Sequence, residues 1–269
     1  MNSRPTIKLR PREDRRIRNG APWVFSNEIV MDAAAKSLAP GTLVELVSAD
    51  GDRLACGYFN SRSLISVRLL APPESAIDTS FFEAQFTRAL KLRQPFFATP
   101  FYRLINAEGD GLPGLIVDRF AETSVVQSTT AGMDNLLEPI LVALDRVAAP
   151  NTIILRNDSP SRALEGLETY TRCARGEQPD KIALEENGAT YFADPARGQK
   201  SGWYFDQRDN RLFMARIGSA RLLDAYCYSG GFSVLSAVMG TREATALDSS
   251  APALALASEA AAANGVSAQ

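Results

Sequence analysis

One stretch decides the fold: LLDAYCYSGGFS, at residues 222–233. Its first half is mostly apolar and predicts a strand, the Gly230-Gly231 pair predicts a tight turn, and a helix is expected directly after it. A glycine pair at such a turn lets a ligand lie against the backbone where a Cβ atom would collide with it. The stretch lacks the G-x-G-x-x-G spacing of a pyrophosphate site, so it favours a ligand without phosphates.

Two carboxylates accompany this turn. Asp248 follows the next expected strand, where an acidic residue can accept hydrogen bonds from ribose hydroxyls. Asp224 lies close to the turn and would favour a cationic group. S-adenosylmethionine meets both demands, because it has a ribose, no phosphate and a cationic sulfonium. An ordinary strand–helix turn with a surface aspartate is the alternative.

A second element lies just upstream, DPARGQKSGWYFDQRDNR at residues 194–211. It combines polar, glycine and aromatic residues at a density that is unusual for a connecting loop. Lys200 or Arg208 could face the methionine carboxylate of the cofactor, and Phe205 could pack near its adenosine. The same loop could equally be the charged end of a hairpin.

The first half of the chain predicts two further units. Short strands at 6–10, 23–30, 42–47, 54–59 and 63–70 favour a small β-barrel-like module, which a polar linker follows. A helix capped by Thr79 or Ser80, a hairpin over 101–120, strands at 123–129 and 151–158, and a helix at 134–147 then make a compact α+β unit that ends near Arg175.

Strand–helix repeats follow in the last third. A hairpin with Asn187-Gly188 at its tip precedes strands at 221–228 and 243–248, each followed by a helix. Ser249 or Ser250 is expected to cap the last helix, and Pro252 suits its first turn.

Composition excludes several classes of protein. Hydrophobic residues make up 45% and charged residues 22%, which is typical of globular proteins, and no apolar run approaches the roughly 20 residues of a membrane span. The N-terminus lacks the apolar core of a signal peptide, so we expect a cytoplasmic protein without a membrane partner. The chain has no histidine, and its three cysteines show no CxxC spacing. These facts argue against a metal site, a disulfide framework and a Ser-His-Asp hydrolase.

Basic residues gather at the N-terminus. A cluster of this kind predicts contacts with the phosphates of a nucleic acid, and a solvated basic terminus without a partner is the alternative. The candidate RNA-binding residues are Lys8, Arg10, Arg12, Arg15, Arg16 and Arg18.

Motifs along the whole chain resemble the RlmI-type family of 23S ribosomal RNA methyltransferases. The C-terminal ones are QKSG (199–202), FDQRDNR (205–211), DAY (224–226) and GGFS (230–233). NAEGDGLPGLIVD (106–118) and Arg162 with EGL (165–167) resemble the central domain of the family, and GAPWVFS (20–26) resembles its N-terminal PUA domain, an RNA-binding β-barrel.

The resemblance implies an α/β and α+β multidomain chain that transfers a methyl group from S-adenosylmethionine to C5 of a cytosine in 23S ribosomal RNA. The implied units are a PUA-like domain over 1–72, a central α+β domain over 79–178, and the first part of a Rossmann-like methyltransferase domain over 181–269. The residues implied to bind the cofactor are Gln199, Lys200, Gly202, Phe205, Asp206, Arg208, Asp224, Tyr226, Gly230 and Asp248.

The catalytic part of the family is not found in the sequence. C5 of cytosine becomes nucleophilic only after a thiolate adds to C6, and the Asp-Pro-Pro motif and catalytic cysteine of the family have no counterpart here. We interpret Cys227, in the cofactor turn, as a packing residue. The sequence therefore predicts a C-terminally truncated chain whose nucleophile lies beyond Gln269. It predicts no turnover, weak cofactor binding, and poor solubility from an open apolar sheet edge.

Two alternatives stay open. The chain could be a non-catalytic RNA-binding protein with a vestigial methyltransferase domain, or an RNA methyltransferase with a different target base. The sequence identifies neither the target nucleotide nor the oligomeric state, and it leaves a homodimer open.

Overall fold

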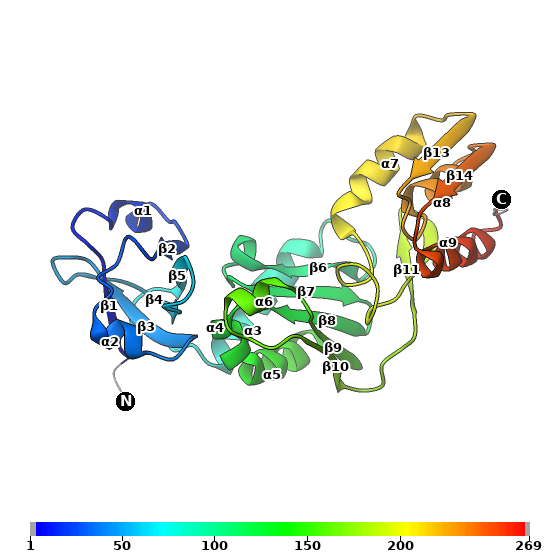
Figure 1. Cartoon of the computed structure of the whole chain (residues 1–269). Coiled ribbons are helices and arrows are strands. Elements are labelled where there is room, and N and C mark those ends of the chain that lie inside the picture. The colour runs from blue at the N-terminus through cyan, green and yellow to red at the C-terminus, as the bar shows by residue number, and fades with distance from the viewer. Residues whose placement is uncertain (1–3, 267–269) are drawn as a thin grey trace.

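The computed structural model describes residues 4–266, and its strands fall into four sheets (Figure 1). In Figure 1 an N-terminal unit in blue, a central unit in green and C-terminal elements in yellow to red follow one another along the molecule. The middle of the chain thus separates its two ends. Within the described residues, no helix has both the length and the apolarity that a membrane crossing requires.

The N-terminal unit is a five-stranded sheet with the order β1-β3-β4-β5-β2. Its strands are β1 (Thr6–Lys8), β2 (Trp23–Phe25), β3 (Thr42–Val47), β4 (Arg53–Phe59) and β5 (Ile65–Ala71), accompanied by the short helices α1 (Arg15–Arg18) and α2 (Ala33–Ser37). The strand expected over 23–30 ends at Phe25, because the Glu28 side chain accepts a hydrogen bond from the Phe25 N–H and the chain turns there.

The central unit is a second five-stranded sheet, ordered β10-β9-β8-β7-β6. It contains α3 (Thr79–Arg93), β6 (Phe101–Asn106), η1 (Ala107–Asp110), β7 (Leu115–Phe120), β8 (Thr123–Ser128), α4 (Ala131–Asn135), α5 (Leu137–Ala148), β9 (Thr152–Asn157), α6 (Ser161–Leu164) and β10 (Tyr170–Arg175). The N-cap of α3 is Asp78 rather than Thr79 or Ser80, because the Asp78 carboxylate accepts from the Phe81 N–H at 3.2 Å.

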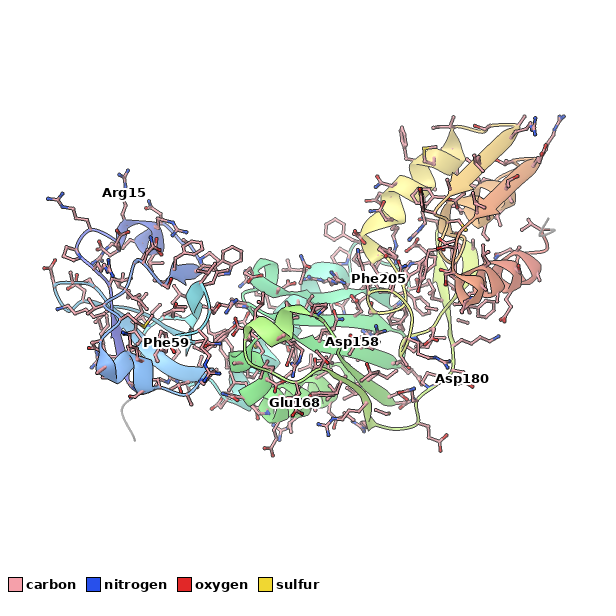
Figure 2. The ribbon with its side chains drawn as sticks, viewed as in Figure 1. Arg15, Phe59, Asp158, Glu168, Asp180 and Phe205 are labelled. Carbon is pink, nitrogen blue, oxygen red and sulfur yellow. The ribbon has the colours of Figure 1, made fainter. Side chains whose placement is uncertain are left out.

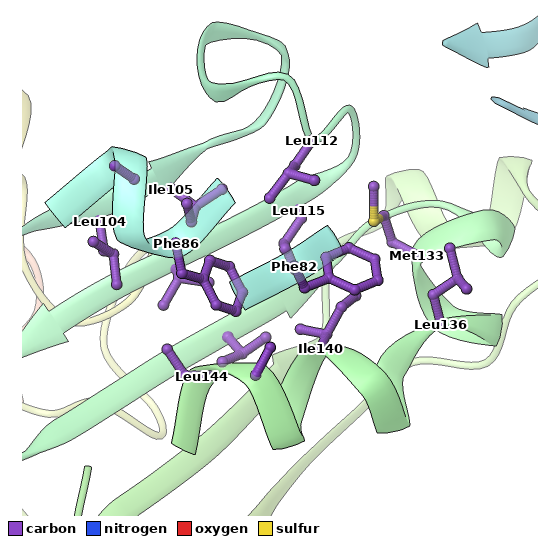
Figure 3. Packing of buried hydrophobic residues seen from close by; sticks show 14 of the residues in the cluster. Phe82, Phe86, Leu104, Ile105, Leu112, Leu115, Met133, Leu136, Ile140 and Leu144 are labelled. Carbon is purple, nitrogen blue, oxygen red and sulfur yellow. The ribbon is translucent and has the colours of Figure 1, made fainter. Parts of the chain in front are cut away.

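Both faces of the central sheet are buried. Helices α3 and α5 cover one face, where Phe82 and Phe86 pack with Ile140 and Leu144 (Figure 3). On the opposite face, Val125 and Ile154 belong to a second core shared with C-terminal residues such as Leu184, Tyr191 and Trp203. Alternate residues of β8 and β9 therefore belong to two different cores, as the two-residue period of a strand requires.

The C-terminal elements begin with the hairpin β11 (Ile182–Glu186) and β12 (Ala189–Ala193). At its tip Asn187 and Gly188 have φ values of 53° and 81°, which confirms the predicted turn. Then follow η2 (Phe205–Gln207), α7 (Arg208–Arg216), β13 (Arg221–Ala225), α8 (Gly231–Val238), β14 (Glu243–Leu247) and α9 (Ala251–Ala263). Strands β13 and β14 are parallel, as the strand–helix repeat predicts, and Ser250 caps α9.

The N-terminal and central units meet through close contacts. The Tyr58 hydroxyl donates to the Pro113 carbonyl at 2.7 Å, and the Glu165 carboxylate binds Asn60 at 2.8 Å and Arg68 at 3.0 Å. Gly132 of α4 lies so near the Tyr58 ring that an added Cβ would stand 2.0 Å from it. Only a glycine allows this approach of helix and ring.

We therefore expect Gly132→Ala to destabilise the protein. Alanine is the better helix former by about 1 kcal/mol, but the clash with the buried Tyr58 ring costs more, so the free energy of unfolding should fall by about 1–2 kcal/mol. Urea unfolding measures this change. Gly109→Ala is the control, because its Cβ would meet nothing closer than 3.5 Å. Equal unfolding midpoints for the two variants would contradict the close contact.

Candidate cofactor site

A cavity of about 570 Å³ lies at the carboxyl ends of β13 and β14. Its walls come from the loop at 199–207, the first turn of α7, the loop after β13, the start of α8 and the residues that follow β14. The carboxyl ends of parallel strands are where open α/β sheets bind ligands, and the volume is that of a small-molecule site.

A buried carboxylate holds the loop and α7 in place. Glu186, at the end of β11, has a fully buried side chain. Its carboxylate accepts from Trp203 Nε1 at 3.1 Å, from Arg208 Nε at 3.1 Å and from Arg211 Nη1 at 2.6 Å. Burying a carboxylate is unfavourable unless it is paired and hydrogen-bonded, and here three donors satisfy it. One side chain thereby fixes one wall of the cavity.

Two tyrosines build the loop side of the cavity. The Tyr228 hydroxyl accepts from the Gln199 N–H at 3.0 Å, and the Tyr204 hydroxyl donates to Gln199 Oε1 at 2.5 Å. The two rings meet edge to face with centroids 5.6 Å apart. Burial raises the pKa of Tyr228 to about 12, so its hydroxyl stays protonated at neutral pH. The pair offers flat apolar surface to a ligand.

Lys200 and Asp206 face each other at the mouth of the cavity. Lys200 Nζ lies 3.1 Å from the Asp206 carboxylate and 4.2 Å from the centre of the Tyr204 ring. Partial burial opposes ionisation of Asp206, but the hydrogen bond and charge of Lys200, together with a hydrogen bond from Gln207, outweigh it and lower the pKa of Asp206. Asp206 is therefore ionised at neutral pH.

Asp248 is an ionised acceptor in the cavity wall. The backbone N–H groups of Ser250 and Tyr228 donate to its carboxylate at 2.9 and 2.8 Å, and they lower its pKa. Each carboxylate oxygen retains a lone pair for a further donor. A ribose diol could supply such donors.

Two donors in the wall lack a partner. Arg211 Nε and Ser229 Oγ are buried, and neither has a hydrogen-bond partner in the part of the chain that the structure describes. Buried polar groups normally have partners, and both residues line the cavity. The carboxylate of S-adenosylmethionine is an acceptor that fits them, so the residues present fit the cofactor.

Of the residues proposed from sequence to bind the cofactor, half line this cavity: Gln199, Lys200, Asp206, Tyr226 and Asp248. The rest have other contacts. Arg208 lies outside the cavity, because its guanidinium pairs with Glu186 and lies 4.6 Å from the Phe97 ring centre. Phe205 packs against Phe120 instead, with ring centroids 5.1 Å apart.

The other three residues, Gly202, Asp224 and Gly230, do not line the cavity. A Cβ on Gly230 would stand 2.9 Å from Ala257 of α9, so Gly230 allows close packing against that helix. Gly231 does line the cavity, and a Cβ there would stand 2.5 Å from Arg211 Nε. Gly202 turns tightly against the Asp194 carbonyl. Asp224 accepts from the Ser233 N–H at 3.0 Å behind the turn, and burial raises its pKa.

Sequence reasoning missed most of the network around Glu186. Trp203 and Arg211 line the cavity, as do Tyr228 and Ser229. Helix α7 was not predicted, because its polar residues were assigned to a loop. Its apolar residues Leu212 and Ala215, three apart on one face, were the signal that could have revealed it.

The N-terminal basic residues divide into two groups. Arg16 pairs with Glu28, Arg18 pairs with Asp14 and Asp52, and Arg10 Nε donates to a backbone carbonyl at 3.0 Å. The other three, Lys8, Arg12 and Arg15, are exposed and form no ion pair with any residue between 4 and 266. These three present the most available positive charge of the cluster.

Known proteins match both the N-terminal unit and nearly the whole chain. A family model for a PUA-like domain matches residues 7–72. A ribosomal RNA large subunit methyltransferase I from Shewanella denitrificans is 36% identical over 97% of this chain and 67% of its own length. The protein of the same name from Pseudoalteromonas atlantica is 34% identical over 92% of this chain and 63% of its own length. The chain thus spans about two thirds of the length of the curated relatives it matches.

Solved structures share the fold. A Streptococcus mutans protein assigned as a SAM-dependent methyltransferase superposes with a TM-score of 0.80 at 20% identity, over 97% of this chain and 68% of the other. A protein assigned as a methyltransferase and solved in complex with SAH gives 0.81 at 19% identity, over 98% and 67%. The fold is therefore a PUA-like domain joined to a Rossmann-like methyltransferase. The chain belongs to the ribosomal RNA large subunit methyltransferase I family, whose cofactor is S-adenosylmethionine.

Proposed function

We propose that this chain supplies the cofactor-binding and RNA-binding functions of a methyltransferase acting on 23S ribosomal RNA, and that the cavity beside β13 and β14 binds the cofactor. The observation that carries the proposal is the chemistry of the cavity wall. It holds an ionised acceptor, Asp248, and the two unpartnered donors Arg211 Nε and Ser229 Oγ. S-adenosylmethionine needs both kinds of partner.

The residues are assigned to parts of the cofactor by their charge and shape. Asp248 would accept the ribose hydroxyls, and Arg211 and Ser229 would bind the methionine carboxylate. The rings of Tyr204 and Tyr228 offer apolar surface to the adenine. When bound, the cofactor supplies a methyl group activated by its sulfonium. The chain's own part is to bind and orient it.

The basic N-terminus is proposed to bind RNA. Lys8, Arg12 and Arg15 carry unneutralised charge on the unit that matches a PUA-like domain. Arg10, Arg16 and Arg18 are engaged within the protein, so we assign them a smaller share of phosphate binding than the sequence suggested. Since the proposed substrate is ribosomal RNA, we expect the protein in the cytoplasm.

These assignments give each part of the chain a different role. We propose that residues 1–72 bind RNA, that 79–178 join the two ends, and that 181–269 bind the cofactor. The two-sided burial of the central sheet supports this division, because one of its faces packs against the residues that carry the cavity.

The proposed target atom is C5 of a cytosine. That reaction needs a thiolate to add to C6 before the methyl transfer and a base to remove the C5 proton afterwards. Cys56 lies in the PUA-like unit and Cys173 on β10, both outside the cavity. Cys227 lines the cavity, but burial raises its pKa to about 11. The proposal therefore assigns the nucleophile to none of the three cysteines.

We expect Asp248→Asn to weaken S-adenosylmethionine binding about tenfold, because hydrogen bonds to a charged acceptor contribute about 1.5–3 kcal/mol. Titration calorimetry measures the dissociation constant. Asp50→Asn, in an exposed turn of the PUA-like unit, is the control and should bind as the unaltered protein does. Unchanged affinity in Asp248→Asn would remove Asp248 from the site.

RNA binding should be electrostatic and should depend on the three unpaired cations. Replacing Lys8, Arg12 and Arg15 by alanine should reduce the slope of log affinity against log salt by about 2–3, roughly one for each lost phosphate contact. Filter binding to 23S RNA across a salt series measures the slope. Arg146→Ala, on α5, serves as the control. A flat salt response, or equal slopes for both variants, would contradict the proposal.

Cys227 should behave as an unactivated thiol. In a variant with Cys56→Ala and Cys173→Ser, iodoacetamide should alkylate Cys227 about ten times faster for each pH unit between about pH 7 and pH 10, because only the thiolate reacts. With a pKa of about 11, the rate should not level off within this range. Mass spectrometry of the labelled protein follows the rate. A plateau near neutral pH would make Cys227 a candidate nucleophile.

A further inference from the structure

A second cavity, of about 300 Å³, lies on the other side of the loop that walls the cofactor cavity. It is formed where α3 and β6 meet η2 and the start of α7. Three aromatic and three arginine side chains dominate its lining, and we call it the aromatic cavity: Phe97, Tyr102, Phe205, Arg93, Arg103 and Arg208. Figure 2 shows Phe205 at the junction of the central sheet and the C-terminal elements.

The lining contains a stack of planar groups that an added base could extend. The Phe97 and Tyr102 rings are stacked, with centroids 5.0 Å apart and planes inclined by 23°. The Arg208 guanidinium lies 4.6 Å from the centre of the Phe97 ring. Rings and guanidinium planes of this kind are the groups on which proteins stack unpaired nucleobases.

Each arginine of the cavity is paired with a carboxylate, and Arg208 shares its partner Glu186 with Arg211. Arg93 binds Asp110 through two contacts of 2.6 Å, Arg103 binds Asp118 at 2.9 and 3.1 Å, and Arg208 binds Glu186. None of the three arginines is thus a free cation for a phosphate. A neutral planar group fits this environment better than an anion.

The aromatic cavity adjoins the cofactor cavity directly. Asp206 contributes to the lining of both. Next to Phe97, the Phe96 ring is 81% exposed, which leaves a further aromatic surface in solvent.

We propose that the aromatic cavity binds one unpaired nucleobase of the RNA substrate, which extends the stack of Arg208, Phe97 and Tyr102 beside the cofactor. The base enters as a neutral ring, and its phosphates remain with the exposed cations elsewhere on the protein. This inference rests on the proposed function, because it takes RNA as the substrate.

Photo-crosslinking tests the location. The probe is a short single-stranded oligocytidine that carries one 5-iodocytidine, irradiated with the full chain and mapped by mass spectrometry of the digested protein. We expect crosslinks on Phe97, Tyr102 or Phe205. Crosslinks confined to the N-terminal basic cluster, or spread over exposed aromatic residues outside the cavity, would overturn the proposal.

A matched pair of variants tests the energetics. Phe97→Leu removes the stacking ring and keeps an apolar side chain, so it should weaken binding of the oligocytidine at least about fivefold. Phe81→Leu makes the same change on α3, where Phe81 packs against Phe82 and does not line the aromatic cavity, and it should leave RNA binding unchanged. Equal affinities for the two variants would overturn the proposal. The crosslink map of the unaltered protein decides the matter if Phe97→Leu does not fold.

Cofactor titrations separate this inference from the proposed function. Phe97→Leu should bind S-adenosylmethionine as the unaltered protein does, because Phe97 does not line the cofactor cavity. Absence of cofactor binding in the unaltered protein would count against the proposed function. Normal cofactor binding with crosslinks elsewhere would count against the aromatic cavity alone.

Discussion

The carboxylate of Glu186 is the interaction on which the candidate site depends. It sits without solvent contact at the end of β11 and binds Trp203, Arg208 and Arg211 together. Removing one partner of such a buried ionic group typically costs about 3–5 kcal/mol, because the remaining charges lose their compensation. The same carboxylate positions Arg208 at the aromatic cavity and Arg211 at the cofactor cavity. The two cavities therefore share one electrostatic support.

The central sheet connects the contacts of Glu186 to the rest of the molecule. Its second face packs against the C-terminal core, and Asp118 of β7, fully buried, binds both Arg103 and Ser201. The Arg156 guanidinium donates to the carbonyls of Pro195 and Gly198 at 3.0 Å each. These polar contacts fix the loop before α7 to the central sheet. Glu186 fixes the same loop to the β11–β12 hairpin.

Local sequence patterns predicted many of the helices and strands but not the contacts of Glu186. The turn at Asn187-Gly188, the cap at Ser250 and the parallel pair β13–β14 depend on neighbouring residues, so the sequence alone was sufficient for them. Strand β10 escaped prediction because it is an edge strand whose side chains are largely exposed and do not alternate. The two-residue period of β11 places Glu186 on the same face as the buried Leu184, but its partners are far apart in the chain and no local pattern identifies them. For the same reason, the sequence suggests Arg208 as a cofactor-binding residue, whereas in the structure its guanidinium pairs with the buried carboxylate of Glu186.

The contact between Tyr58 and Gly132 has a consequence for how the protein handles a long polymer. Ring and helix backbone meet without an intervening side chain, and on the other face of the central sheet its residues share a core with the C-terminal elements. Such interfaces resist sliding, because close-packed interiors are stiff. We therefore expect the distance from the basic helix α1 to the C-terminal cavities to change little. An RNA that contacts both ends of the protein would therefore have to bend to reach them.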